Sequence, residues 1–410
     1  MKTLVTVLML CIASLVNAQK LTMAQWQQDL KVYQEQLEVK HIDLYNKISK
    51  PEFDATLKNI ESSLDTATDF EVMAALMKLT HRIGDGHTSI SLWNQDMHYY
   101  PIGIYKFGNK WLVTATTTAD KAMLGAELTA INNIPVDEVA HKLAPYYQFV
   151  ENSHSNSTRF VDCFNHFELL QLLGITKKEA TTFTFISKDG TPQKITLEPL
   201  KRTEYDEVVT QSLVYSIPQI AAPVVRVSNG FWAAPITNTN AVYIYYRNYP
   251  TFEEMQQFGE QLVGYCATNN IRKVVIDMRQ NWGGDLFVGL TLAYVINLAD
   301  GLDFKNGMYV LSDHKTFSAA TINTAQYRAL LNATIVGLPT GSNPVGYQDM
   351  STFELPNSAL KINYSKRYFK LQETATDGVQ PDIEIPYDPN KIAAGIDNML
   401  AWLYNNKLKE

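Results

Sequence analysis

The stretch VVIDMRQNWGG (Val274–Gly284) decides the fold of this chain. It begins as an apolar run typical of a buried strand and ends in a Gly-Gly turn. Strands and helices alternate on both sides of it, which predicts a β/α layered core over residues 205–410. Asp277 and Arg279, within the stretch, are expected to form a buried structural ion pair. Near the C-terminus, residues 351–369 are expected to form a hairpin and residues 392–408 a closing helix.

The composition is that of a large folded protein. The chain has 410 residues, of which 46% are hydrophobic and 19% charged. These values predict two or three domains with a sizeable core and exclude a mostly disordered chain. The net charge is −7, and no cluster of basic residues is present. Nucleic acid is therefore not expected as a partner.

The first 18 residues are typical of a secretory signal. Lys2 provides the positive start, an apolar stretch follows from Leu4 to Val16, and Ala18 offers a small residue for cleavage. A lipid attached at Cys11 is disfavoured because the bulky Leu10 precedes it. We therefore expect a periplasmic or secreted protein with no stable membrane insertion after cleavage.

Two cysteines, Cys163 and Cys266, remain after the signal. They lie too far apart to indicate a disulfide framework, so we expect two buried free thiols. Neither has a His or Cys neighbour at the spacing of a metal ligand, so no metal or cofactor is indicated.

Two segments precede the core. Residues 19–95 carry helical patterns, with apolar or aromatic positions at Trp26, Leu30, Tyr33 and Leu37. Residues 96–200 have the composition of strands. Within them a glycine, an apolar strand, an Asn-Asn turn and a helix follow in the order found in PDZ domains, with residues 146–173 as a loop-and-helix insertion. An unrelated small β domain is the alternative.

The sequence KTFSAA (Lys315–Ala320) follows an apolar run and opens a helical segment. A serine at a strand-to-helix turn projects its hydroxyl, and the amides at the helix N-terminus point outward. This geometry suits a nucleophile together with an oxyanion site, which makes Ser318 a candidate. The alternative is an ordinary N-cap serine.

A serine hydroxyl needs a base to take its proton. No lysine stands between Ala319 and Leu360, which argues against a Ser-Lys dyad. His87, on the glycine turn GDGHT, is the preferred base because imidazole titrates near neutral pH. His314 is the rival.

Two further roles complete the predicted site. Asp85 and Glu373 are the candidates for orienting the imidazole. The Ala319 amide is one expected oxyanion donor, and Gly283 or Gly284 supplies the other, since a backbone without Cβ allows a close approach. The Gly-Gly segment could also be an ordinary turn. A phosphate site is disfavoured because GxGxxG and GK[ST] are absent.

Together these segments resemble the serine peptidases of the C-terminal processing and tricorn protease family. The resemblance rests on five motifs in order: GDGHT (84–88), IDMRQNWGG (276–284), FSAA (317–320), IVGLPTG (335–341) and GVQPDI (378–383). It implies an α+β multidomain protein with an N-terminal helical segment, a PDZ-like domain that gathers substrate, and a crotonase-like β/α peptidase core.

The resemblance also implies the roles of the site residues. Ser318 would be the nucleophile, with Gly283 or Gly284 and Ala319 at the oxyanion. The tricorn-like branch uses Ser and His with a further Ser and Glu behind the His. His87 matches the His and Glu373 is favoured as the Glu, but Gly86 stands where that branch has the further Ser.

The sequence thus predicts an exported, metal-independent serine peptidase that acts on peptides or proteins through an acyl-enzyme. A catalytically inactive peptide-binding protein that uses its PDZ-like groove is one alternative. An esterase or other acyl hydrolase is another, disfavoured because the chain lacks a Gly-x-Ser-x-Gly elbow. The oligomeric state is left open.

Overall fold

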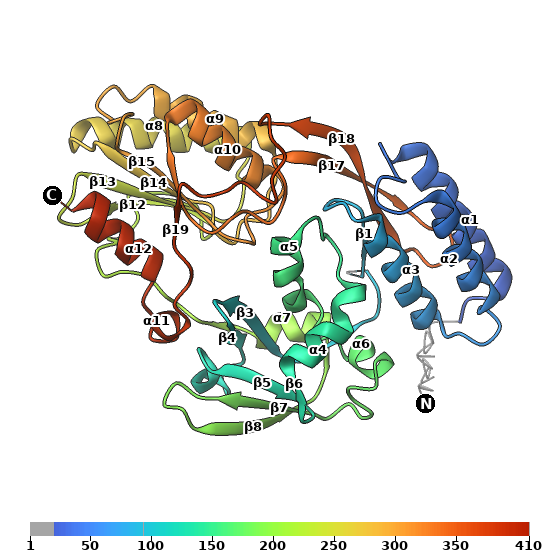
Figure 1. Ribbon diagram of the computed structural model, residues 1–410. Coiled ribbons are helices and arrows are strands. Elements are labelled where there is room, and N and C mark those ends of the chain that lie inside the picture. Colours follow the sequence, from blue (N-terminus) through green and yellow to red (C-terminus); the bar gives the residue numbers. More distant parts are fainter. Residues whose placement is uncertain (1–19, 93, 410) are drawn as a thin grey trace, which may run out of the picture.

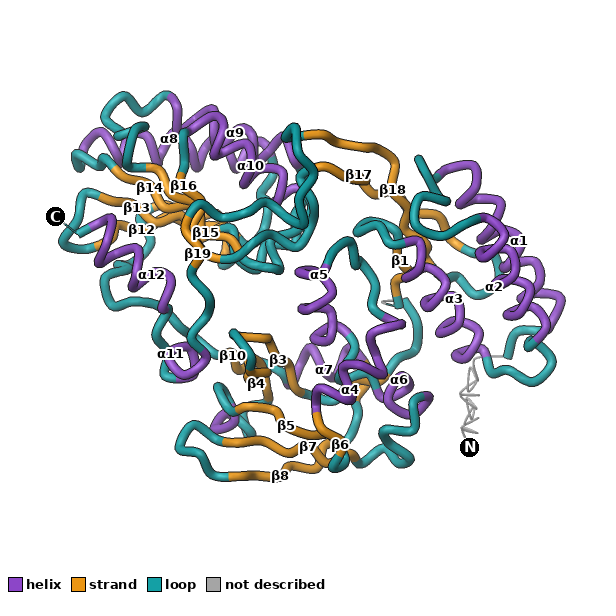
Figure 2. The backbone as a smooth tube through the Cα atoms, viewed as in Figure 1, coloured by secondary structure: helices purple, strands orange, loops and turns teal. Residues whose placement is uncertain are grey.

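The computed structural model describes residues 20–92 and 94–409, so the predicted signal lies outside the described residues. The described part is a mixed α+β fold with several separate sheets (Figures 1 and 2). Three bodies are visible in Figure 1: the N-terminal helices, a middle sheet, and a C-terminal sheet covered by helices. None of the helices in the described part is long and apolar enough to span a membrane.

Three helices form the N-terminal body: α1 (Met23–Lys40), α2 (Lys50–Ser62) and α3 (Asp69–Ile83). Each begins with a capping box, in which a Ser or Thr side chain and a Glu or Gln side chain satisfy free amides of the first turn. The expected apolar stripe of α1 is buried, as predicted. Helix α3 ends at Gly84 with φ +74°, and this left-handed residue turns the chain toward His87.

The middle body is built on a sheet with the order β10-β4-β5-β7-β8, with β3 paired to β4 and β6 to β5. Its elements are β3 (Ile102–Phe107), β4 (Lys110–Thr116), β5 (Glu127–Ile131), β6 (Ile134–Pro135), α4 (Val136–Leu143), β7 (Thr181–Ile186), β8 (Pro192–Leu197) and β10 (Gln211–Ser212). The strands expected near residues 100–105, 111–115 and 182–186 are therefore present.

Short helices fill the segment between α4 and β7. They are η2 (Ala144–Tyr146), α5 (Ser153–Thr158), η3 (Arg159–Asp162) and α6 (Phe167–Leu172). A small sheet of β2 (His98–Tyr99) and β9 (Leu200–Lys201) and the helix α7 (Arg202–Val208) lie at the border of this body. The 146–173 segment contains the buried Cys163, which is free, as is the buried Cys266.

The C-terminal body contains the predicted β/α core. Its sheet has the order β11-β12-β13-β14-β15-β16-β19, parallel from β13 onward. The strands are β11 (Val225–Ser228), β12 (Phe231–Ile236), β13 (Ala241–Tyr246), β14 (Lys273–Asp277), β15 (Met308–Ser312), β16 (Thr334–Gly337) and β19 (Ile383–Glu384). Helices α8 (Phe252–Thr268), α9 (Leu286–Asn297) and α10 (Ala319–Leu331) cover one face (Figure 1).

A buried ion network fixes the edge of the core where β14 ends. Arg279 donates to Asp277 at 2.7 Å and to Asp397 at 2.6 Å, and Arg247 donates to Asp277 at 3.0 Å. The predicted pair of Asp277 and Arg279 is thus confirmed. Burial opposes the charge of Asp277, but the two guanidinium groups hold its pKa well below the usual range.

The predicted closing helix over residues 392–408 is wrong as a single element. The chain forms α11 (Pro389–Ala393), then α12 (Asn398–Leu403) and a π-helical turn, η4 (Tyr404–Leu408). Gly395 interrupts the helix with φ +82°. Asp397 then caps α12 by accepting from two of its amides while it also binds Arg279. The ion network therefore decides where the last helix begins.

The predicted hairpin is present as β17 (Val345–Glu354) and β18 (Lys361–Lys370). It extends away from the core, and β18 pairs with β1 (Ser89–Ser91) of the N-terminal body (Figure 2). This antiparallel pairing anchors the strand that directly follows His87. As a result, the GDGHT turn is held beside the hairpin, where Ser365 of β18 donates to Asp85.

Candidate active site

Ser318 lies at the turn from β15 into α10, as the sequence predicts. Its backbone has φ +52° and ψ −129°, a conformation rarely adopted by residues other than glycine. Its side chain makes no capping hydrogen bond, so the hydroxyl is not an ordinary N-cap. The amide of Ser318 donates to Ser342 Oγ at 2.8 Å, and Ser342 in turn donates to Thr321 at 2.9 Å. These bonds help to hold the strained turn.

His87 meets Ser318 across 231 positions of sequence, with 2.9 Å between Nε2 and Oγ. Its ring is buried and stacks on Phe317 with 5.4 Å between the centroids and an angle of 25°. A Cβ on Gly86 would lie only 2.8 Å from the Phe317 ring. Glycine at position 86 therefore makes room for the ring that supports the imidazole.

The electrostatic environment favours a neutral His87. Burial lowers the pKa of His87 to about 4, although the nearby Asp85 and the backbone of Tyr347 act in the opposite direction. A neutral imidazole can accept the Ser318 proton at Nε2 only when the remaining ring proton is on Nδ1. That Nδ1 atom is buried and makes no hydrogen bond of normal geometry within the described residues.

Asp85 and Glu373 are the two residues that the sequence offers for orienting the imidazole of His87. Neither forms a hydrogen bond with that ring. Asp85 accepts from the His87 backbone amide at 2.8 Å, while its other oxygen lies 2.7 Å from the His41 ring. Burial tends to raise the pKa of Asp85, but the bonds with His41, Ser365 and Thr88 lower it to about 2. Glu373 is exposed and makes no hydrogen bond to the described residues. The role of Glu373 in orienting His87 stays a prediction.

The segments expected to supply the oxyanion donors lie close to Ser318. A Cβ on Gly283 would lie 2.8 Å from Ser318 Cβ and 3.0 Å from the Ala319 amide nitrogen. The Gly283 amide donates to the Asn281 side chain at 2.8 Å. The amides of Gly284 and Ala319 make no hydrogen bond within the described part of the chain. Of the two glycines, Gly284 therefore has the free donor.

The rival base His314 is engaged elsewhere. Its Nδ1 lies 2.9 Å from the carbonyl oxygen of Pro339, and its ring stacks on His154 with 4.7 Å between the centroids. The structure places no hydrogen bond between His314 and Ser318. His87, and not His314, is thus the histidine at hydrogen-bond distance from Ser318.

Buried side chains of the 146–173 segment also surround the site, and the sequence gives no sign of them. Glu151 is buried and accepts from the Asn343 amide at 3.0 Å, directly after Ser342. Burial raises the pKa of Glu151 to about 8. Arg159 is also buried, with 1% of its surface exposed. Its guanidinium carbon lies 4.1 Å from the centre of the Trp282 ring and 4.6 Å from the centre of the Phe317 ring. No local motif marks these residues, because only the tertiary fold brings them to the site.

Comparison with known proteins agrees with this geometry. Residues 295–385, which include Ser318, match the family model described as Peptidase family S41. No curated protein matches the chain. Among solved structures, mature CPAF complexed with lactacystin has a TM-score of 0.67 and 14% identity, covering 94% of this chain and 98% of that one. Mature CPAF has a TM-score of 0.63 and 14% identity, covering 93% and 96%.

At this identity the likeness to CPAF is one of fold. The family match and the shared fold confirm the resemblance that the sequence carries, that of a serine-type peptidase. The class implies a peptide or protein substrate.

Proposed function

We propose that this chain is an exported serine peptidase in which Ser318 is the nucleophile and His87 the general base. One observation carries the proposal: His87 Nε2 lies 2.9 Å from Ser318 Oγ at a strained strand-to-helix turn. Because its pKa is lowered to about 4, His87 is neutral and able to accept a proton at neutral pH. A binding protein without activity has no chemical need for this pair.

The reaction follows from these positions. As Ser318 Oγ attacks the carbonyl carbon of the scissile peptide, its proton passes to His87 Nε2. The carbonyl oxygen becomes an oxyanion that accepts from the Ala319 and Gly284 amides. His87 returns the proton to the leaving amine, the C–N bond breaks, and the acyl group stays on Ser318. Water then attacks the ester, with His87 as base again, and releases the acid product.

The surrounding units would serve this reaction. We assign the β domain over residues 96–200 to a PDZ-like fold, supported by the consecutive elements β5, β6 and α4, and residues 205–410 to a crotonase-like core. The N-terminal helical segment spans residues 19–95. Residues 1–18 would direct the chain to the periplasm or to secretion before being removed.

Labelling with a fluorophosphonate tests the proposal. The mature protein is compared with Ser318→Ala and His87→Ala, and the labelled peptide is identified by mass spectrometry. His314→Ala is the matched control, because His314 lies near the turn in sequence but bonds to Pro339. We expect label on Ser318 in the wild type and in the His314 variant, and none in the other two.

Label retained in His87→Ala but lost in His314→Ala would reverse the assignment of the base. A folded wild-type protein that takes no label and cleaves no peptide would favour the inactive binding protein. Since mature CPAF was solved in complex with lactacystin, lactacystin is a useful second probe of the same serine.

A further inference from the structure

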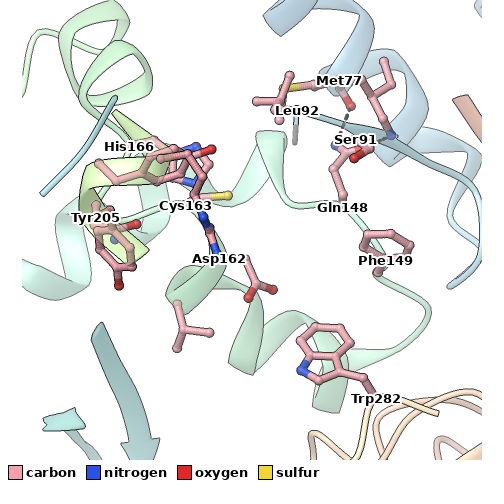
Figure 3. A pocket seen from close by; sticks show the side chains of 15 residues that line it. Met77, Ser91, Leu92, Gln148, Phe149, Asp162, Cys163, His166, Tyr205 and Trp282 are labelled. Atoms are coloured by element: carbon pink, nitrogen blue, oxygen red, sulfur yellow. Dashed lines mark hydrogen bonds between the residues drawn. The ribbon is translucent and has the colours of Figure 1, made fainter. Parts of the chain in front are cut away.

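A cavity of about 570 Å³ has Trp282, the residue before Gly283, in its wall (Figure 3). Its wall combines residues of the N-terminal body, the 146–173 segment, α7 and the loop after β14. Most of its large side chains are apolar or aromatic: Met77, Leu92, Phe149, Val161, Tyr205 and Trp282. Ser318, His87 and the oxyanion residues are not among the lining residues.

Trp282 connects this cavity to the nucleophile. Its ring lines the cavity and also packs against Phe317 with 6.0 Å between the centroids. The next residue, Gly283, is in contact with Ser318. Figure 3 shows Trp282 and Phe149 on one side of the open space and Cys163, His166 and Tyr205 on the other. The residue that precedes Gly283 therefore forms part of the cavity wall, which places the cavity close to the loop that contacts Ser318.

The charged groups of the wall are already compensated. Arg159 lies 3.7 Å from Asp162, and Arg202 pairs with Asp206 at 2.9 Å. His166 is neutral at physiological pH because burial lowers its pKa to about 4. Burial also raises the pKa of the Cys163 thiol. A charged side chain entering the cavity would lose its hydration without gaining a free counter-charge.

The size of the cavity points to large side chains. A cavity of about 150 Å³ is enough to hold a benzene ring, and this one is several times larger. It falls within the range of roughly 300–1,000 Å³ that ligand pockets occupy. An alanine side chain would leave most of the apolar wall uncovered.

We propose that this cavity is a substrate pocket that receives large apolar side chains, aromatic or branched aliphatic, adjacent to the bond cleaved at Ser318. The inference rests on the proposed function and deepens it by naming the substrate class. A large apolar residue can be placed at each position of a peptide in turn. The position at which it strengthens binding most is the one whose side chain enters the cavity.

Binding to the Ser318→Ala protein separates the pocket from the chemistry. The probes are blocked alanine hexapeptides in which one phenylalanine, leucine or glutamate is moved along the chain. We expect phenylalanine and leucine at one position to strengthen binding about tenfold or more over alanine, as burial of such a side chain predicts. Glutamate at that position should give no gain.

Two variants in this background test whether the gain arises in the cavity. Val161→Phe narrows it and should remove the gain, whereas Tyr205→Ala enlarges it and should move the preference toward larger side chains. Val39→Phe, at an exposed position on α1, is the matched control and should leave binding unchanged. If Val161→Phe does not fold, Tyr205→Ala still decides the question.

The proposal falls if no position favours phenylalanine or leucine, or if the preference is the same in the cavity variants and in Val39→Phe. Fluorophosphonate labelling of the Val39→Phe protein with Ser318 restored should stay within about twofold of the wild type. If the wild type takes no label but the peptide preference is present and depends on Val161, the pocket stands and the proposed catalysis does not.

Discussion

Lowering the pH from 7 to 5 should leave the reactivity of Ser318 almost unchanged. Burial lowers the pKa of His87 from 6.5 to about 4. At pH 5, an imidazole with the ordinary pKa would be neutral in roughly 3% of molecules, whereas one with a pKa of about 4 would be neutral in roughly 90%. Since only the neutral ring can take the Ser318 proton, the two cases differ about thirtyfold in rate at that pH.

The assay is the second-order rate of fluorophosphonate labelling at Ser318, measured from about pH 4 to about pH 8 and corrected for hydrolysis of the probe. Substitution His166→Gln serves as the control, because His166 is also a buried histidine but does not contact Ser318. The labelling rate of that variant should depend on pH below neutrality in the same way as the rate of the wild type. A wild-type rate that is half-maximal near pH 6.5 would refute the reasoning, since it would mean that His87 is well solvated.

The same shift in pKa makes a prediction about stability. Between about pH 6.5 and about pH 4 the unfolded chain binds a proton at His87 and the folded chain does not. The free energy of unfolding therefore falls as the pH is lowered through this window, by up to about 3 kcal/mol from this group. In urea unfolding, the His87→Asn protein should lose correspondingly less free energy of unfolding than the wild type when the pH is lowered through this window. An identical pH dependence of the two proteins would contradict the shift.

Three substitutions test the structure around the site. Ser342→Ala leaves the buried amide of Ser318 without its acceptor, which should cost about 1–3 kcal/mol and slow labelling; an unchanged rate would show that the strained turn holds itself. Gly283→Ala places a Cβ 2.8 Å from Ser318 Cβ at φ +98°, so labelling should be lost while circular dichroism stays native, and full labelling would argue against the oxyanion loop. Arg279→Met leaves the buried Asp397 without a guanidinium partner and Asp277 with Arg247 alone, so it should lower the free energy of urea unfolding by about 3–5 kcal/mol, against at most about 1 kcal/mol for the exposed Lys31→Met; equal effects would contradict the network.

Much of the core could be predicted because its signals are local. A parallel strand buried on both faces appears as an apolar run, and helices between such strands show helical periodicity. The pair of Asp277 and Arg279 could be inferred because its members are two residues apart at the end of such a strand. The last helix could not be predicted, since its start depends on Asp397 reaching Arg279, 118 positions away.

By itself the sequence indicated the two side chains that we propose react: Ser318 at a strand-to-helix turn and His87 on a glycine turn. Their special backbone positions leave a local trace in residue type and spacing. Only the tertiary structure decided what surrounds them. The β1–β18 pairing carries His87 to Ser318, the 146–173 segment brings Glu151 and Arg159 to the site, and Glu373 stays in solvent. Burial and long-range contacts of this kind set the pKa of His87, and no local pattern in the sequence encodes them.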